Sequence, residues 1–391
     1  MGPRFSIVIP TYNRSQLLRF ALESAVRQEH ESFEVIVSDD HSTDDTAAVT
    51  AEVGGANVRH LLTPGRMTMA EHFEWASEQA EGEFVMFLCD DDVLSRHTLA
   101  EADRAVAETD AQVVALNSGV YVFPDWDEGD EQNRLSYTVY SPGLVRCESQ
   151  AVLKGLFDLS PNFLTPRGNN SFCHRDVIAE VRARNEQFFL HPAPDMSSCS
   201  AVLGVVPFYT LITAPLHVWG VSPESLGAIQ TSKGGEARER SKEAFGKKDF
   251  FELSPFDVYC PANIWAESML QVKRIRPDEY PELNYLRLYL ECREYLMGIG
   301  AKGYDVNEEF EKLESSRAEL GMSAGKAKIA HLLKQKAIAS PFGKLLVRLK
   351  HSVVPPLVPM KEVEKVKVDG KDAGFSNILE SVDQFDKFFV G

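Results

Sequence analysis

The feature that most constrains the fold is a series of short, almost wholly apolar segments, each followed by polar or acidic residues. Residues 5–9, 83–88 and 113–116 are such segments, and residues 34–38 and 58–62 are further strand candidates with more polar side chains. A strand with apolar side chains on both sides is buried on both faces, as in a parallel sheet covered by helices. Residues 17–26 and 69–80, which lie between such segments, place apolar side chains at helical spacing. This alternation predicts an α/β fold with a mostly parallel sheet flanked by helices.

Polar residues follow three of the predicted strands directly, at positions 10–14, 39–42 and 90–92. Open parallel sheets bind their ligands at the carboxyl ends of the strands, where the loops that follow the strands gather. We therefore expect the ligand site at this edge of the sheet.

The strongest chemical signal is the run Asp90, Asp91 and Asp92 at the end of a buried strand. Three adjacent carboxylates repel one another and lose hydration there, so a bound cation is the simplest compensation. Magnesium or manganese fits, because such hard ions prefer oxygen ligands and often join carboxylates to substrate phosphates. The alternative is that the run caps a helix that begins near Ser95.

Composition narrows the class of partner. The chain has 391 residues, 44% of them hydrophobic, and can bury a large core. Its formal net charge of −17 argues against a general nucleic-acid binder, which needs a basic surface to neutralise phosphates. The six cysteines are scattered without a CxxC pair, so we expect reduced thiols. No apolar run approaches the roughly 20 residues that span a bilayer, and we expect a cytoplasmic protein.

Three motifs stand at the predicted strand ends: residues 5–14 (FSIVIPTYNR), 33–45 (FEVIVSDDHSTDD) and 80–94 (AEGEFVMFLCDDDVL). In combination they resemble the family 2 glycosyltransferases, which have the GT-A fold, a Rossmann-like α/β sheet. The resemblance covers roughly the first 120 residues. It implies an inverting enzyme that moves a sugar from a nucleotide-diphosphate donor with the help of Mn²⁺ or Mg²⁺.

The resemblance also implies a donor site at the strand ends. Its nucleotide-binding residues would be Pro10, Thr11, Tyr12, Arg14, Asp40, Asp90 and Asp91. Asp40 matches the carboxylate that accepts a hydrogen bond from the base, typically uracil or thymine. Asp91 and Asp92 match metal-binding positions of a DxD-like element, and the resemblance does not decide which aspartate of the run is the direct ligand.

We interpret two further residues near this site as structural or surface residues without a role in binding. His72 stands where similar sequences often carry Asn, and a single His on a helix is more often structural. Arg66 lies in a Pro-Gly-Arg turn and is within reach of a phosphate, but we interpret it as a solvated surface residue.

An inverting transferase needs a general base that takes the proton of the acceptor hydroxyl. Asp195 stands where the family usually has its catalytic aspartate, although the usual Glu-Asp pair is Pro194-Asp195 here. The alternatives are that Asp195 is the N-cap of the helix that follows, and that His191 is the base. His217 and Trp219 are candidates for the acceptor site, or else packed core residues.

We divide the chain into a glycosyltransferase domain, residues 1–235, and a mostly helical C-terminal region, residues 236–391. Within the first, residues 1–117 are the nucleotide-sugar-binding half and residues 118–235 the acceptor half. Residues 320–361 contain eight Lys or Arg residues and no Asp or Glu. With their leucines they are predicted to form basic amphipathic helices that lie on the inner face of a membrane, or a helical face that docks on the acidic main body.

We expect transfer from a UDP- or dTDP-type donor to a glycan or lipid-linked acceptor, as in bacterial surface polysaccharide assembly. One alternative is a degenerate domain that binds nucleotide sugar or a partner without turnover. A sugar nucleotidyltransferase is a weaker alternative, because it would carry a Gly-rich, basic loop after the first strand. The sequence leaves the sugar, the acceptor, the linkage and the oligomeric state open.

Overall fold

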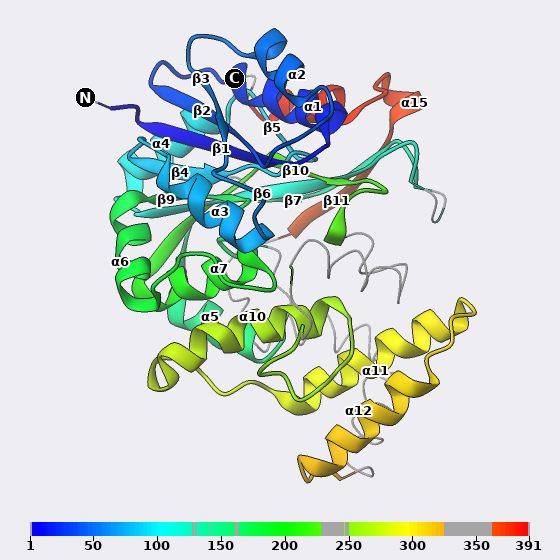
Figure 1. The fold of residues 1–391 in the computed structure, drawn as a ribbon. Coiled ribbons are helices and arrows are strands. Elements are labelled where there is room, and N and C mark those ends of the chain that lie inside the picture. The colour runs from blue at the N-terminus through cyan, green and yellow to red at the C-terminus, as the bar shows by residue number, and fades with distance from the viewer. Residues whose placement is uncertain are drawn as a thin grey trace.

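The computed structural model describes residues 2–126, 129, 131–141, 143–160, 164–227, 246, 250–323 and 362–389. These residues form one mixed sheet with helices on both faces (Figure 1). Helices α1 (Ser15–Val26) and α2 (Thr46–Val53) cover one face, and α3 (Met69–Glu78) and α7 (Pro194–Val205) lie on the other. A further layer of helices lies beyond α7.

Four neighbouring strands make a fully parallel half of the sheet, in the spatial order β4, β1, β2, β3. They are β1 (Phe5–Thr11), β2 (Phe33–Asp39), β3 (Val58–Leu62) and β4 (Phe84–Phe87). The register sets Thr11 beside Asp39 and Val8 beside Phe87. The carboxyl ends of β1, β2 and β4 therefore meet at one edge, as predicted.

The other half is built around two long parallel strands, β6 (Val113–Val122) and β10 (Phe208–Val221). Its antiparallel strands are β5 (Val93–Leu94), β7 (Arg134–Tyr140), β8 (Leu144–Glu148) and β9 (Ser171–His174), and its other helices are α4 (Thr98–Thr109), α5 (Ser149–Phe157) and α6 (Arg175–Asn185). Strand β9 joins the halves by pairing with both β4 and β6. The α/β fold with a mostly parallel central sheet flanked by helices is confirmed.

In the sequence Ser42 resembles the N-cap of a helix, but in the structure it does not cap α2. The helix begins at Thr46, because the Asp44 carboxylate accepts hydrogen bonds from the Thr46 backbone N–H and hydroxyl. The Ser42 hydroxyl instead accepts a bond from the backbone N–H of Asn13, at 2.9 Å. Ser42 thus holds the loop after β1 against the loop after β2.

The helices expected near the C-terminus are α10 (Pro261–Ile275), α11 (Tyr285–Ala301) and α12 (Asn307–Glu319). They are not a separate body, because Ala266 and Met269 of α10 share one buried core with Cys199 and Leu203 of α7. Helix α10 therefore packs directly on the helix that carries Asp195.

The end of the chain differs from the expected helical region. Strand β11 (Glu362–Asp369) pairs antiparallel with β7 and extends the main sheet. The short helix α16 (Ile378–Val382) and the turns after it follow, and Phe385 is fully buried beside Tyr137. Residues 362–389 pack against the sheet because their apolar side chains form one buried core cluster with residues of β5, β7 and β10. The boundary at residue 235 and residues 324–361 of the basic segment lie outside the described residues.

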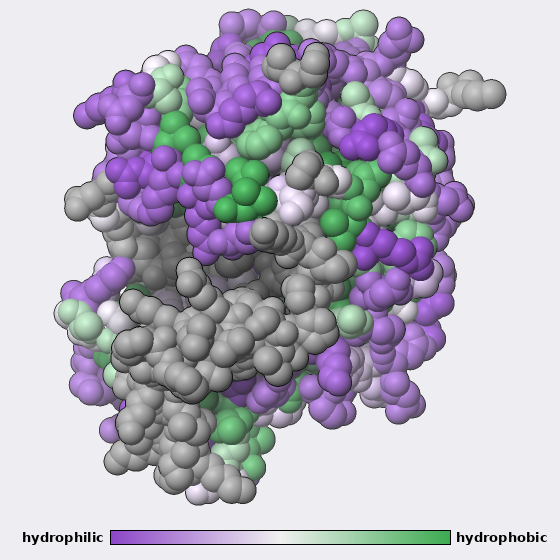
Figure 2. All heavy atoms as spheres, turned by 180° about the vertical axis from the view of Figure 1, so that it is seen from behind, coloured by the Kyte–Doolittle hydropathy of each residue, from purple (hydrophilic) through white to green (hydrophobic). Residues whose placement is uncertain are grey.

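Figure 2 shows that the face opposite the view of Figure 1 is largely hydrophilic where residues are described, with hydrophobic side chains in small groups. Within the described ranges, no helix is long and apolar enough to cross a membrane.

Glu74 on α3 fixes the segment that leads into α7. Its buried carboxylate accepts hydrogen bonds from the backbone N–H groups of Phe188 and Phe189, at 2.8 and 2.9 Å. The Arg182 guanidinium donates a third bond, at 2.6 Å. A buried carboxylate with this many charge-assisted bonds stabilises the fold, because its removal would leave several donors unsatisfied.

We expect Glu74→Ala to lower the free energy of unfolding by about 2–4 kcal/mol, since two backbone N–H groups and Arg182 would lose their acceptor. Glu78→Ala, at an exposed position on the same helix, should change it by less than about 0.5 kcal/mol. Chemical denaturation of both variants tests this, and equal effects would contradict the structural role of Glu74.

Candidate functional site

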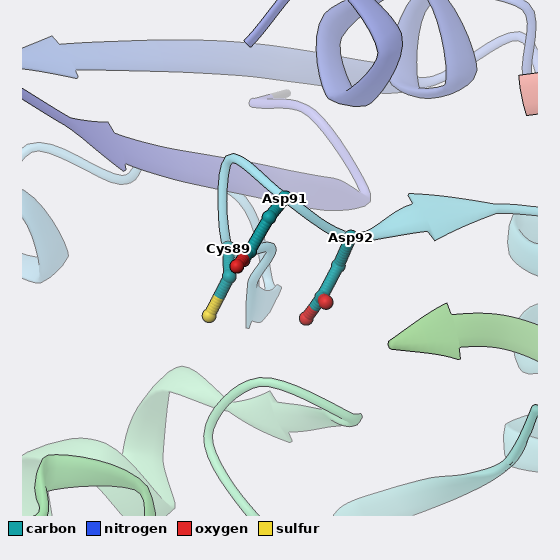
Figure 3. A group of neighbouring side chains, drawn as sticks. All are labelled: Cys89, Asp91 and Asp92. Atoms are coloured by element: carbon teal, nitrogen blue, oxygen red, sulfur yellow. The ribbon is translucent and has the colours of Figure 1, made fainter. Parts of the chain in front are cut away.

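The site is centred on a tight turn between β4 and β5 that carries the three aspartates. Asp90, Asp91 and Asp92 are all buried, with at most 9% of their surface exposed. The side chains of Cys89, Asp91 and Asp92 point to the same side of the turn (Figure 3), and one candidate ligand atom from each lies within 4.8 Å of the others. The turn thus concentrates negative charge in a place with little water.

Arg14, at the start of α1, neutralises part of this charge. Its guanidinium contacts Asp90 at 2.5 Å and Asp91 at 2.9 Å. Burial acts to lower the pKa of Arg14, but the attraction of Asp90 and Asp91 outweighs it and raises the pKa. Asp90 also accepts a bond from the Thr11 hydroxyl, at 2.8 Å. Burial nevertheless raises the pKa of Asp90 to about 7, against the opposing effect of Arg14.

Asp92 is held from the side of β10. It accepts a hydrogen bond from the backbone N–H of Gly220 at 2.9 Å, and its Oδ2 lies 3.4 Å from Nε2 of His217. A side chain at Gly220 would overlap the carbonyl oxygen of Asp91, so this close approach requires glycine. Burial raises the pKa of Asp92, and the contact with His217 opposes this.

His217, a candidate for the acceptor site or else a packed core residue, is buried beside the acidic turn. The antiparallel pairing of β10 with β5 sets His217 beside Leu94, next to the acidic turn. The imidazole is fully buried, and its Nδ1 bonds to the Ser118 hydroxyl at 2.9 Å. The ring therefore faces Asp92 from within the protein.

Two residues just after β10 complete the surroundings of the turn. The Ser225 hydroxyl donates to Asp91 Oδ2 at 2.5 Å, and the Glu224 carboxylate lies 3.5 Å from Nε of Arg14. Sequence reasoning missed both residues, because they follow the acidic run by more than 130 positions and belong to no motif.

The residues around the turn fit a divalent cation with oxygen ligands. Asp91 and Asp92 offer two carboxylates from one turn, which suits Mg²⁺ or Mn²⁺. Burial, and then the neighbouring aspartates, raise the pKa of the Cys89 thiol, so it stays neutral and is a poor ligand for a hard ion. Nε2 of His217 is buried and lies 3.4 Å from Oδ2 of Asp92, so the imidazole borders this group of ligands through Asp92.

A second group of side chains lies at the ends of β1 and β2. The Asp40 carboxylate accepts bonds from the Thr63 hydroxyl at 2.8 Å and from the Arg66 guanidinium at 2.5 Å. The guanidinium carbon of Arg66 also lies 3.4 Å from the centre of the Tyr12 ring, which is 41% exposed. Arg66 is thus a half-exposed surface residue, with 51% of its side chain accessible, whose guanidinium also pairs with Asp40 and lies over Tyr12. Pro10 is buried in β1 beside Ser38 of β2.

The structural interpretation of His72 agrees with its environment. The ring is buried on α3 and bonds to the Ser38 hydroxyl at 2.8 Å. Burial lowers its pKa, so the imidazole stays neutral near pH 7.

Asp195 is the second residue of α7, and its side chain is 27% exposed. The N-cap position is taken by Ala193, so Asp195 is not the N-cap. Nη1 of Arg167 lies 3.4 Å from Oδ2 of Asp195. The same guanidinium lies 5.8 Å from the centre of the Trp219 ring, which places Trp219 on the Asp195 side of the site. His191 packs edge to face against Phe250.

Comparisons with known proteins agree with the three strand-end motifs. Residues 6–154 match the family model described as Glycosyl transferase family 2. Over 95 residues the chain is 37% identical to a GalNAc(5)-diNAcBac-PP-undecaprenol beta-1,3-glucosyltransferase of Campylobacter jejuni, covering 24% of this chain and 31% of that protein. Over 122 residues it is 33% identical to the poly(ribitol-phosphate) beta-N-acetylglucosaminyltransferase TarS of Staphylococcus aureus, covering 29% of this chain and 20% of TarS.

The crystal structure of TarS from the same organism aligns with a TM-score of 0.43 at 21% identity, covering 58% of this chain and 38% of that one. This chain spans less than a third of the length of either curated relative.

The matched stretch contains the strand ends that carry Arg14, Asp40 and the three aspartates. Asp195, Trp219 and the C-terminal helices lie beyond it. By this sequence match, residues 6–154 are a glycosyl transferase family 2 segment.

Proposed function

We propose that this protein is a metal-dependent inverting glycosyltransferase that moves a sugar from a nucleotide-diphosphate donor to a glycan or lipid-linked acceptor. The proposal is carried by the arrangement of two sets of carboxylates. Asp91 and Asp92 lie on one side of the buried acidic turn, and the partly exposed carboxylate of Asp195 contacts a short loop that also contacts this turn. An inverting displacement needs a charge-stabilised leaving diphosphate on one side of the sugar and a base on the other.

The donor base would bind at Tyr12, Asp40 and Arg66. The imide edge of uracil or thymine presents one N–H group between two carbonyls. Asp40 would accept the N–H, Arg66 would donate to a carbonyl, and the exposed Tyr12 ring would stack on the base. This complementarity supports a UDP- or dTDP-type donor.

Asp91 and Asp92 would hold Mn²⁺ or Mg²⁺, which neutralises the charge that develops on the departing diphosphate. Arg14 would hold Asp90 and Asp91 in place, and His217 would orient Asp92. Asp195 would take the proton of the acceptor hydroxyl as its oxygen attacks the anomeric carbon.

The acceptor class is proposed from the relatives. One is named for an acceptor linked to undecaprenol through a diphosphate, and the other for a poly(ribitol phosphate) acceptor. Both names fit bacterial surface polysaccharide or polymer synthesis. Peripheral membrane contact through residues 320–361 and a cytoplasmic location stay predictions.

The main alternative is a domain that binds nucleotide sugar without turnover. Carboxylates are present at both the metal and the base positions, which favours an enzyme. A sugar nucleotidyltransferase is disfavoured, because the loop between β1 and α1 contains no glycine.

We expect Asp91→Asn and Asp92→Asn each to weaken Mn²⁺-dependent binding of a nucleoside diphosphate at least about tenfold, because each removes a charged oxygen ligand. Isothermal titration with UDP, dTDP and GDP, with Mn²⁺ and with chelator, measures this. Asp278→Asn, at an exposed position in the helical region, is the matched control. If the wild type bound no nucleotide with Mn²⁺ present, the proposed function would be wrong.

Asp195→Asn should leave nucleotide binding within about twofold of the wild type and lower kcat by about 10²–10⁴-fold, because only proton removal is lost. Release of nucleoside diphosphate with a panel of lipid-linked and polysaccharide acceptors gives the rate. Undiminished turnover would exclude Asp195 as the base and point to His191.

Metal binding should depend on pH through Asp90. Burial raises the pKa of Asp90 to about 7 in the metal-free protein, so folding takes up a proton at acidic pH, and the resulting stabilisation falls as pH rises toward 7. A cation at Asp91 and Asp92 would expel this proton, so Mn²⁺ affinity should be about tenfold weaker at pH 6 than at pH 8. Titrations across this range test it, with Asp90→Asn expected to show a smaller change. Equal wild-type affinities would contradict the prediction.

A further inference from the structure

A loop of three residues, Arg167 to Asn169, spans the distance between the acidic turn and Asp195. At one end, the Asn169 amide donates to Sγ of Cys89 at 3.8 Å. At the other end, Arg167 contacts Asp195 at 3.4 Å. The position between a leaving diphosphate and a general base is where the transferred sugar of an inverting enzyme must lie.

The backbone of this loop is held firmly. The carbonyl of Gly168 accepts a hydrogen bond from the backbone N–H of Phe87 in β4, at 3.1 Å. A Cβ at Gly168 would lie 3.0 Å from the Phe189 ring and 3.1 Å from the Ser198 hydroxyl of α7. The loop is therefore seated between β4 and α7 with no room for a side chain at its centre.

Two polar atoms of this loop lack hydrogen-bond partners. Nε of Arg167 and Oδ1 of Asn169 are buried and make no hydrogen bond within the described residues. Buried polar groups of this kind are rare in folded proteins, because each loses its hydration without compensation. The two residues as a whole are partly exposed, although these two atoms themselves are covered.

Aromatic side chains from two other elements hold the Arg167 guanidinium. It lies 5.0 Å from the ring centre of Trp265 on α10 and 5.8 Å from that of Trp219 on β10. Cation–π contacts of this kind orient the guanidinium plane without using its N–H donors. Arg167 thus uses Nη1 for Asp195 and leaves Nε without a partner among the described residues, and Trp265 of α10, outside the stretch matched by the family model, helps to position the guanidinium.

We propose that the loop Arg167 to Asn169 binds the transferred sugar and selects it. The ligand class is a pyranose, with Asn169 Oδ1 accepting from a ring hydroxyl or an amide N–H and Arg167 donating to a ring-substituent oxygen. This proposal rests on the proposed function, because it assumes a nucleotide-sugar donor whose diphosphate lies at the acidic turn.

The test compares nucleotides with and without their sugar. Mn²⁺-loaded wild type, Asn169→Ala, Arg167→Lys and the control Asn307→Ala, exposed near the start of α12, are titrated with free UDP and dTDP and with their glucose, galactose and N-acetylglucosamine conjugates. Thermal unfolding of each variant confirms that it is folded. Arg167→Lys keeps the charge and removes the planar fork, so it provides a second variant if Asn169→Ala does not fold.

We expect both loop variants to bind the free nucleotide within about twofold of the wild type and to bind the preferred sugar conjugate about tenfold more weakly, with less discrimination among sugars. The control should match the wild type throughout. If the wild type bound free nucleotide but the loop variants kept its preference for one conjugate, or if the wild type had no such preference, the loop would not be a sugar site. If the wild type bound no nucleotide at all, the donor site itself would be wrong, and this inference would fall with it.

Discussion

The ion pairs of Arg14 with Asp90 and Asp91 are the interactions on which the rest of the site depends. Three carboxylates buried in one turn would oppose folding, because each loses hydration and repels its neighbours. A guanidinium at the start of α1 offsets part of that cost and ties α1 to the turn between β4 and β5. The negative charge that remains is what a divalent cation would neutralise under the proposed function.

Packing behind the turn supports this arrangement from the far end of the chain. Val93 of β5 and Val218 of β10 share a buried cluster with Phe385, while Leu17 of α1 packs against the same cluster. Asp383 near the C-terminus contacts Arg27 at the end of α1, at 2.7 Å. The elements that carry Arg14, Asp92 and His217 thus rest on one core, which residues 362–389 complete.

The surroundings of Asp195 are assembled differently, from helices that pack on the sheet. Asp195 is the second residue of α7, and α10 packs on α7 and brings Trp265 to Arg167. The Ala193 N–H donates to the Ser268 hydroxyl of α10 at 2.9 Å, which fixes the start of α7. The part of the chain that follows the family match therefore packs around Asp195 and Arg167.

The alternation of strands and helices in the first hundred residues, the edge at which their polar ends meet and the acidic turn were all predictable, because apolar periodicity and turn residues act over short stretches. The sequence by itself determined these features, and it marked Asp195 through resemblance alone. Only the tertiary structure decided that His217 faces Asp92, that Ser225 reaches Asp91, that Arg66 stacks on Tyr12 and that residues 362–369 join the sheet. The physical reason is that strand register and packing between distant segments set these contacts, and no local pattern in the sequence records which distant residue will fill a given position.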